Sequence, residues 1–538
     1  MMVAAANPHA ARAGLNILRA GGSAVDAAIA VQLVLTLVEP QSSGIGGGGF
    51  LMYYDRSSGE ITAYDGRETA PAAATEKIFL SPDGEPLGFF DAVMGGKSVG
   101  VPGIVRLFEQ VHGAHGRLPW PDLFSPATAL AENGFEVSPR LNFLLTWDRD
   151  RLAEFPGTRE YFLDREGQPL LVGTLLKNPA LADTFRILAA EGAPAFYGGG
   201  IAADIVATVR TAPRAPGSLG LSDLASYSAK KRQPICGKYR DNHICGMGPP
   251  SSGGLTTLIT LGILENFDLA SVKPGSVKAI HLISEASRLA FADRAAYMGD
   301  ADFIEIPIAG LLAADYLKDR ATLIDPDRAM TTAAAGKVVG WTGPPPGPEA
   351  TLAQPSTSHF TVVDGDGNVV AMTSSVEFAF GSHLMVRGFL LNNQLTDFSF
   401  RPSKDGAPVA NRVEGGKRPR SSMSPTIVLD RDNRFRLAVG SPGGSNIIGY
   451  VTKTLVGALD WNLDVQQAIS LPNHISRGGP LYVETGTVYQ DLTGPLASLG
   501  HDARSRRLNS GLHGISRDAD GKLYGGADPR REGVAVGN

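Results

Sequence analysis

Apolar residues recur at helical spacing in two stretches near the start of the chain. The first stretch covers residues 8–20, and the second covers residues 23–38 after a Gly-Gly break. Ser23 and Asp26 form an S-x-x-D capping box at the start of the second stretch, which supports a helix there. This helix is too short to cross a bilayer and contains Asp26 and Gln32, so no membrane span is expected.

Strand patterns occur at both ends of the chain. The segments GGFLMYYD and EITAYDGRETAP are the first predicted strands, and the long middle region is mainly helical, with an amphipathic helix at residues 276–298. Further strands are predicted in the last third, at residues 358–363, 368–376, 387–391, 425–430 and 434–439. Strands at both ends with helices between them indicate a layered α+β domain built from both halves of the chain.

A linker-like segment meets a predicted strand at Thr357. Residues 328–356 are rich in Ala, Gly and Pro, and little in them can pack. The stretch that follows, TSHFTVVDGDGNVVAMTSSVEF, has the alternation and the turn residues of a hairpin. Many threonines at strand starts do no more than favour the strand. If the chain is cut before Thr357, however, one residue carries both a hydroxyl nucleophile and an α-amine that can act as its general base.

The overall charge argues against two kinds of partner. The 538 residues carry a net charge of -5 and a pI near 6.1, so neither nucleic acid nor an anionic membrane is an expected partner. The opening MMVAAANPHAARAG lacks the basic start, apolar run and cleavage site of a secretory signal. A cytoplasmic location is therefore expected, or a periplasmic or secreted one if the N-terminus has been trimmed.

The two cysteines, Cys236 and Cys245, would face each other across a hairpin that turns at residues 239–242. A disulfide could form between them in an oxidising compartment, but the missing signal favours two reduced thiols. Neither cysteine has the spacing of a metal site or of a redox CxxC motif. Because the sequence shows no cluster of ligands, neither a metal nor an organic cofactor is expected.

Two glycine-rich segments resemble nucleotide-binding loops only in part. GIGGGGF, residues 44–50, follows a helix and opens a strand, which reverses the order of a dinucleotide-binding motif. GGKS, residues 95–98, has Asp91 where a phosphate loop needs its first glycine, and no helical pattern follows. Tight turns that let two backbones approach each other explain both segments better.

Eight short motifs, in order, resemble those of one family: GGSAVDAAIA, QSSGIGGGGF, DGRETAP, PPSSGG, TSHFTVVD, FLLNNQLTDFSF, KRPRSSMSPTI and GSPGGSNII. Over nearly its whole length the chain resembles the γ-glutamyltranspeptidase family of N-terminal-nucleophile hydrolases. The resemblance implies a four-layer αββα sandwich made as a precursor, which cuts itself into a large subunit, residues 1–356, and a small subunit, residues 357–538, that stay together. It also implies γ-glutamyltransferase or glutathione hydrolase activity, with a glutathione-like donor and an amino acid, a peptide or water as acceptor.

The resemblance also implies which residues are catalytic. Thr357 matches the family's nucleophile, and Ser375 matches a hydroxyl that contacts the amine of the nucleophile. Gly443 and Gly444 match backbone N–H donors for the tetrahedral oxyanion.

The residues implied for substrate binding suit the charges of a γ-glutamyl group, which carries an α-carboxylate and an α-ammonium. Arg67 matches the arginine that binds the carboxylate, because its planar fork suits two oxygens. Ser421 and Ser422 match two hydroxyls on the same carboxylate. Asp397 matches the acid that holds the ammonium, with Gln394 beside it.

Two positions depart from the family's pattern. Glu377 stands at the ammonium-binding position where well-studied members carry Asn, so that two acids would lie near one cation. This glutamate could strengthen ammonium binding or serve a different amine-bearing acyl group. Residues 400–420 contain no Tyr or Trp, whereas members with a lid over the site carry an aromatic gate in that segment. A more open site is therefore expected.

Three functions compete. The first is a γ-glutamyl hydrolase or transferase, the second is an acylase for another amide such as a glutaryl-cephalosporin, and the third is an uncut, inactive scaffold protein. A glutaryl group has no ammonium to pair with Asp397, which argues against the second. The intact Thr357, Arg67 and Gly443-Gly444 argue against the third. The first function is therefore favoured.

Overall fold

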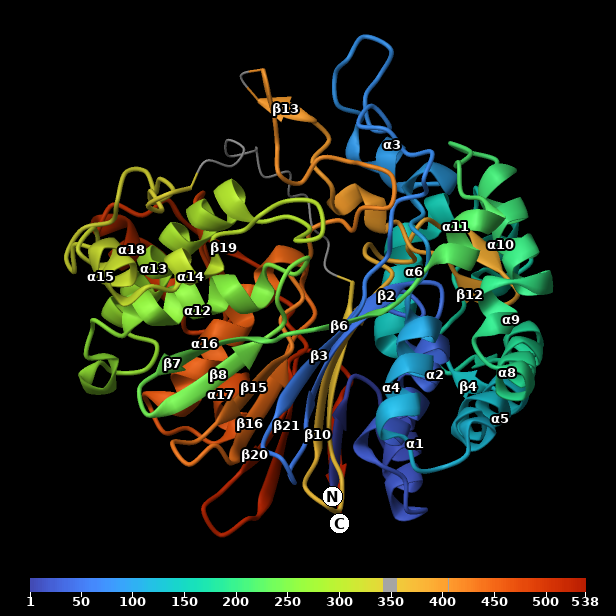
Figure 1. Cartoon of the computed structure of the whole chain (residues 1–538), viewed down its shortest axis with the longest axis horizontal. Helices are drawn as coiled ribbons and strands as arrows, with labels where there is room; N and C mark the ends of the chain where they lie inside the picture. The colour runs from blue at the N-terminus through green and yellow to red at the C-terminus, as the bar shows by residue number, and fades with distance from the viewer. Residues whose placement is uncertain (342–355, 405) are drawn as a thin grey trace.

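The computed structural model describes residues 1–341, 356–404 and 406–538. Two β-sheets pack face to face at its centre, and helices cover the outer face of each (Figure 1). The first sheet has the strand order β22-β1-β9-β10-β2-β3-β6, and the second has the order β21-β20-β16-β15-β8-β7. The layers are therefore helix, sheet, sheet and helix.

Strands of both halves of the chain build both sheets. The first sheet contains β1 (Met2–Ala5), β2 (Gly48–Tyr54), β3 (Ile61–Gly66), β6 (Lys230–Arg232), β9 (Ser358–Val363), β10 (Val369–Ser375) and β22 (Val534–Gly537). The second contains β7 (Ile235–Tyr239), β8 (Asn242–Gly246), β15 (Thr426–Leu429), β16 (Phe435–Gly440), β20 (His513–Arg517) and β21 (Leu523–Ala527).

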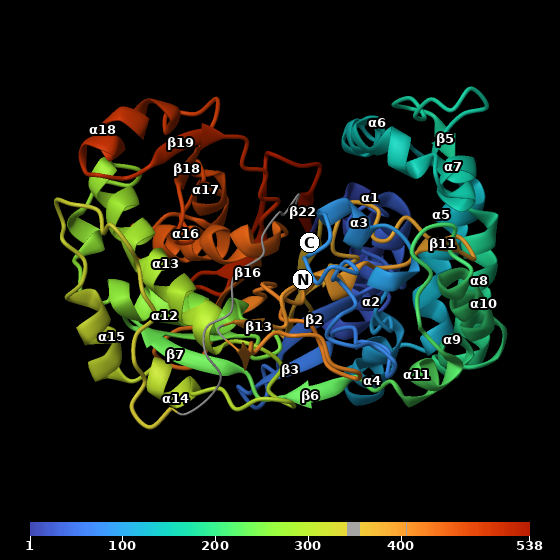
Figure 2. The ribbon, with the colours of Figure 1, turned by 90° about the horizontal axis from the view of Figure 1, so that it is seen from above.

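The helices form two outer layers, which Figure 2 shows on either side of the sheets. The first sheet is covered by α1 (Pro8–Arg19), α2 (Ala24–Val38) and α4 (Ile104–His115). The second is covered by α12 (Gly253–Leu264), α13 (Val277–Tyr297), α16 (Ile447–Leu459) and α17 (Val465–Ser470). Beyond α2 lies a further bank with α5 (Ser125–Asn133), α6 (Pro139–Leu152), α8 (Pro179–Glu191) and α10 (Gly199–Arg210).

The core explains why the central strands are apolar on both faces. Along β2, Leu51 and Tyr53 pack with the helices α1 and α2, while Phe50 and Met52 pack between the two sheets. Successive side chains of a strand point to opposite faces, so a strand between a helix layer and a second sheet buries every residue. All seven residues of β2 are buried.

Most predicted elements are confirmed, and one is wrong. Helices α1 and α2 have the predicted positions, and Ser23 and Asp26 form the predicted capping box. Residues 387–391 do not form one strand, because the positive φ angles of Arg387 (44°) and Gly388 (84°) turn the chain there. The result is a small hairpin of β11 (Met385–Val386) and β12 (Phe389–Leu390).

The predicted linker is only partly described, because its residues 342–355 lie outside the described residues. In its first part, Ala329 and Val338 are buried, and the ring of Trp341 meets the ring of Tyr297 edge to face at 5.8 Å. Most other residues of 328–341 are exposed or half-buried, and Val339 is 97% exposed, so only a few side chains of this part of the segment pack on the helical layer.

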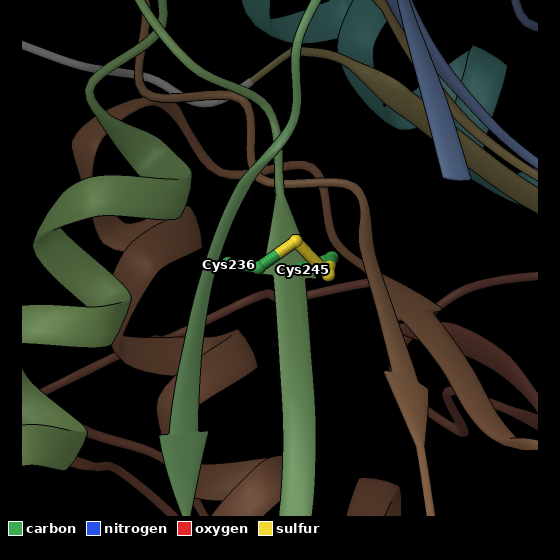
Figure 3. Close-up of a disulfide and its surroundings, with 2 residues drawn as sticks. All are labelled: Cys236 and Cys245. Atoms are coloured by element: carbon green, nitrogen blue, oxygen red, sulfur yellow. A yellow bond between two sulfur atoms is a disulfide. The ribbon is translucent and has the colours of Figure 1, made fainter. Parts of the chain in front are cut away.

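The cysteines form a disulfide, so the preference for reduced thiols is wrong (Figure 3). Strands β7 and β8 pair Cys236 directly with Cys245, with 4.1 Å between their Cα atoms. The predicted hairpin thus holds the two sulfur atoms within bonding distance. Separately, none of the helices in the described parts of the chain is both long and apolar enough to cross a membrane.

Candidate active site

Thr357 immediately precedes β9 and is almost fully buried, with 4% of its surface exposed. Its Oγ1 lies 2.5 Å from the carbonyl oxygen of Ser356, across the intact peptide bond, and 3.1 Å from Oγ of Ser375. The Ser375 hydroxyl also donates to the carbonyl oxygen of Ser356 at 3.1 Å. The predicted nucleophile, its neighbouring hydroxyl and the predicted cleavage site therefore meet at one point.

The β9–β10 hairpin brings these groups together. Asp364 closes the turn, because its carboxylate accepts hydrogen bonds from the backbone N–H groups of Asp366 and Asn368. The register pairs Ser358 with Ser374, so the next residues outward, Thr357 and Ser375, lie side by side at the open end of the hairpin.

A second group of polar residues holds Ser356 from the other side. The Ser356 hydroxyl donates to the carbonyl oxygen of Gln41 and lies 3.4 Å from Oγ of Ser42. Ser42 in turn donates to the buried carboxylate of Glu39 at 3.0 Å. Sequence reasoning missed these residues, because they follow α2 and are more than 300 positions away from Ser356.

Arg67 follows β3, and its side chain is fully buried. The hydroxyl of Tyr227 fixes the Arg67 carbonyl at 2.8 Å, and Nε of Arg67 donates to the carbonyl oxygen of Pro419 at 3.1 Å. Nη2 pairs with Oδ2 of Asp397 at 2.5 Å. Nη1 has no hydrogen-bond partner among the described residues and lies 3.9 Å from Oε2 of the buried Glu68.

The residues predicted for the ammonium cluster around Asp397. Gln394 lies in the same short 3-10 helix, and its amide donates to Oδ2 of Asp397 at 3.0 Å. Glu377 follows β10 with a φ angle of 79°, and its backbone N–H donates to Oγ of Ser375 at 2.8 Å. Its carboxylate accepts from the amide of Asn393 at 2.7 Å. Glu377 thus connects the Thr357 hydroxyl group to the ammonium position.

Three acidic side chains lie close to Arg67. Glu377, Asp397 and Glu68 lie around the guanidinium of Arg67, and both oxygens of Glu68 are buried without a hydrogen-bond partner among the described residues. Removal of water, and then the charge of Asp397, hold the pKa of Glu377 above its usual range. Burial raises the pKa of Glu68 to about 8. Both shifts favour the protonated, neutral forms of these two acids, and a cation bound beside them would favour their ionised forms.

Glu68 was not among the predicted residues, although it directly follows Arg67 in DGRETAP. The glycine-rich segment makes room for it. A Cβ atom at Gly48 would lie 2.2 Å from Oε2 of Glu68, and one at Gly47 would lie 2.1 Å from the carbonyl oxygen of Ser375. The segment GIGGGGF therefore lets the backbone approach the site closely. This agrees with the expectation of tight turns that let two backbones approach each other.

Ser421 and Ser422 lie beside the Arg67 pocket, next to Pro419, whose carbonyl Arg67 binds. The segment is held by the loop after β8, because the N–H and hydroxyl of Ser252 both donate to the carbonyl oxygen of Ser421, at 2.8 and 2.6 Å. The Ser422 hydroxyl accepts from Nη2 of Arg294 at 2.8 Å. Arg294 is thus a further residue that sequence reasoning missed.

Gly443 and Gly444 follow β16 and have φ angles of 142° and 56°. Such angles favour glycine, and they lead the chain into a short 3-10 helix, Gly444–Asn446, that precedes α16. Gly440, at the end of β16, approaches so closely that a Cβ there would lie 2.3 Å from the ring of His359 in β9. The two glycines therefore extend from the strand that packs against the start of β9.

In the parts of the chain that the structure describes, no group of three or more His, Cys, Asp or Glu side chains could hold a metal ion. The arrangement is one of the buried Thr357 hydroxyl, the Ser356 carbonyl, a guanidinium and a set of acidic side chains. These are groups suited to acyl transfer through an ester and to recognition of a zwitterionic head group.

Comparison with known proteins agrees with the fold and the motifs. The glutathione hydrolase proenzyme of Bacillus subtilis (strain 168) is 36% identical, over 100% of this chain and 91% of that protein. The Acylase ACY 1 proenzyme of Pseudomonas sp. (strain SE83) is 34% identical, over 99% of this chain and 93% of that protein. The crystal structure of cephalosporin acylase from Bacillus halodurans superposes with a TM-score of 0.85 at 26% identity, covering 99% of this chain and 95% of that one.

The four-layer αββα sandwich expected from the motifs is confirmed, and it is the fold of the N-terminal-nucleophile hydrolases. The family model described as Gamma-glutamyltranspeptidase matches residues 10–538. The chain therefore belongs to the γ-glutamyltranspeptidase family.

Proposed function

We propose that the chain is a precursor that cuts itself between Ser356 and Thr357 and then hydrolyses or transfers γ-glutamyl groups from amides such as glutathione. The observation that carries this proposal is the position of Thr357. Its hydroxyl touches Ser375, which touches Glu377, which borders the Arg67–Asp397 pair. The glutathione hydrolase proenzymes among the relatives support the same activity.

Self-cleavage would begin with attack of Oγ1 of Thr357 on the carbonyl carbon of Ser356. A new C–O bond forms, the C–N bond between the two residues breaks, and the nitrogen of Thr357 takes a proton. The hydrogen bond from Ser375 to the Ser356 carbonyl oxygen stabilises the negative charge that develops there. Water then hydrolyses the ester, which leaves Thr357 with a free α-amine and hydroxyl.

Turnover uses the same hydroxyl. The α-amine of Thr357 accepts the hydroxyl proton as Oγ1 attacks the γ-carbonyl of the donor, and the backbone N–H groups of Gly443 and Gly444 receive the oxyanion. The leaving amine departs with that proton, and a γ-glutamyl-threonine ester remains. Water, or the amino group of an amino acid or peptide, then attacks the ester and frees Thr357.

Head-group recognition follows from charge pairing. In the free chain Arg67 and Asp397 pair with each other, and Gln394 bonds Asp397. An α-carboxylate could bind Arg67, with Ser421 and Ser422 beside it, while the α-ammonium takes Asp397 and Glu377. Every charge would then have a partner of opposite sign, whereas a glutaryl group would leave both acids without a cation.

The test of this proposal is Thr357→Ala. The variant should give one uncut band on a denaturing gel and no γ-glutamyl hydrolase activity, while the exposed Thr146→Ala control should give two bands and normal activity. A Thr357→Ala chain that still splits at this bond would exclude Thr357 as the nucleophile of maturation.

A second candidate function is acylase activity toward a glutaryl amide, which the acylase relatives favour. A panel of γ-glutamyl and glutaryl anilides separates the two functions. Glu377→Asn should weaken the preference for γ-glutamyl over glutaryl by about 1–3 kcal/mol, the size of one charge-assisted contact. An unchanged ratio of kcat/KM values would show that Glu377 does not read the ammonium.

The compartment is part of the same proposal. Disulfides persist mainly in oxidising compartments, so the Cys236–Cys245 bond supports a periplasmic or secreted enzyme over a cytoplasmic one.

A further inference from the structure

Arg531 lies where the chain crosses from the second sheet to the first, between β21 and β22. Its side chain is buried, and Nη1 donates to the carbonyl oxygen of Thr357 at 3.2 Å. Nη2 donates to the carbonyl oxygen of Asn509 at 3.4 Å. A buried guanidinium is thus held against the backbone of the proposed nucleophile by two carbonyl groups.

The turn that carries Arg531 is firmly fixed. Asp528 accepts hydrogen bonds from the backbone N–H groups of Gly511 and Leu512, at 2.7 and 3.0 Å. Arg530 pairs with Asp528 at 3.0 Å and with Glu484. A Cβ at Gly511 would lie 2.5 Å from Cδ of Arg531, so this glycine makes room for the side chain. The position of Arg531 is therefore set by the fold.

Several other charged or titratable groups face Arg531 or the Thr357 site: Glu39, Arg140, His359, Glu377, Tyr450, His513, Asp528 and Glu532. The carboxylate of Glu39 acts on both Arg531 and Arg140, because Nε of Arg140 lies 3.6 Å from it. Burial and the charge of Arg140 lower the pKa of Arg531 to about 9. The guanidinium accordingly still carries its charge at neutral pH.

We propose that Arg531 is a positioning residue that keeps the α-amine of Thr357 uncharged, and so able to accept a proton, near neutral pH. The proposal rests on the function proposed above. A free α-amine has an ordinary pKa of about 7.7–8.0, so much of it would be protonated at pH 7. A cation bonded to the carbonyl of the same residue disfavours that protonation. The hydrogen bond also holds the residue so that Oγ1 faces Ser375.

The experiment is the pH profile of kcat/KM on a γ-glutamyl anilide, whose acid limb reports the base of the free enzyme. Arg531→Gln should move the acid limb to higher pH by about one unit, because a nearby positive charge is lost. Arg531→Lys keeps the charge and should keep the limb in place. Arg434→Gln is the control, since Arg434 belongs to the same predicted subunit but pairs with Asp430 and Asp432 on the surface rather than with Thr357.

Several results would overturn the proposal. One is an unmoved acid limb in Arg531→Gln, and another is a limb that moves equally far in Arg531→Lys. A folded Arg531→Gln chain that never cleaves would assign Arg531 to maturation instead. If Arg531→Gln does not fold, Glu39→Gln offers a second test, because it removes a negative charge near the α-amine instead of a positive one. The acid limb should then move to lower pH, and a limb that fails to do so contradicts the proposal. Failure of the proposed γ-glutamyl function would be recognised by a different result, because the Thr357→Ala variant would then remain active.

Discussion

Arg67 and Asp397 neutralise each other in the free chain, which has a consequence for specificity. Their contact of 2.5 Å must open before a head group can bind between them. Only a ligand that supplies both a carboxylate and an ammonium replaces this one ion pair by two. A ligand with a carboxylate alone leaves Asp397 partly buried without a partner, which is costly.

Arg67→Lys tests the geometry of this contact. Lysine keeps the charge but loses the planar fork, so kcat/KM on γ-glutamyl donors should fall by roughly 30-fold or more, equivalent to about 2 kcal/mol of a charge-assisted bond. The control is Arg214→Lys, whose side chain pairs with Asp91 and Glu154 on the surface. Unchanged kinetics in Arg67→Lys would remove Arg67 from the site.

Glu68 should make stability depend on pH. Its pKa is raised to about 8 in the folded chain, whereas an unfolded chain holds a glutamate near 4.3. Between these values the folded state binds more protons, so the free energy of unfolding should fall as pH rises from about 5 to about 8. In a Thr357→Ala background, Glu68→Gln should flatten this dependence by about 1–3 kcal/mol, and the exposed Glu60→Gln should not. Equal slopes in all three chains would contradict the assignment.

Two hairpins with short turns have different structural roles. The β9–β10 hairpin aligns Thr357 with Ser375, while the β7–β8 hairpin is closed by the disulfide and leads into the loop that holds Ser421. In both, turn residues and alternation made the pairing visible in the sequence. The disulfide was not predicted, because the lack of a secretory signal favours reduced thiols although the register of the hairpin places the two cysteines opposite each other.

Loss of the disulfide should cost stability rather than catalysis. The cross-link joins residues nine positions apart, for which chain-entropy arguments give roughly 2–3 kcal/mol. Cys236→Ser combined with Cys245→Ser should therefore lower the thermal midpoint while kcat/KM stays near that of the unmodified enzyme. A reductant should lower the midpoint of the unmodified enzyme and leave that of the double variant unchanged. A large loss of kcat/KM would show that the hairpin also shapes the Ser421 loop.

Some of the site could not have been predicted from the sequence alone. Thr357, Arg67 and Asp397 could be predicted, because each lies in a short recognisable motif and has a side chain suited to the chemistry expected there. Arg531 and Ser42 meet the Thr357 segment across 174 and 314 positions of the chain, and Glu39 does so through Ser42. A single sequence carries no signal for such contacts. The prediction of one strand at residues 387–391 is wrong for a local reason, because alternation alone does not reveal a positive φ angle at Arg387.

Over the whole molecule, each of the two central sheets contains strands of both predicted subunits, paired edge to edge. In the first sheet β9 and β10 lie between β1 and β2, and in the second sheet β15 pairs with β8. Cleavage after Ser356 would therefore leave both sheets built from both pieces, with every ladder of backbone hydrogen bonds intact.

The two pieces should consequently behave as one protein until it unfolds. Native size-exclusion chromatography should give a single species with the mass of the full chain or a multiple of it, and a denaturing gel of that species should show bands for residues 1–356 and 357–538. Thr357→Ala should elute at the same volume and give one band. Separation of the pieces without denaturant would contradict the pairing of strands from both pieces within each sheet.

The same sheet order brings the two ends of the chain together. Met2 pairs with Gly537 at the end of the sheet opposite Thr357, and Figure 1 shows both termini there. A circularly permuted chain, with these ends joined by a short linker and opened before Thr357, would acquire the N-terminal threonine from removal of its initiator methionine instead of from self-cleavage. Such a chain would make catalysis measurable in variants of Ser356, Ser42 or Ser375 that never mature, so that the chemistry of cutting and the chemistry of turnover could be studied one at a time.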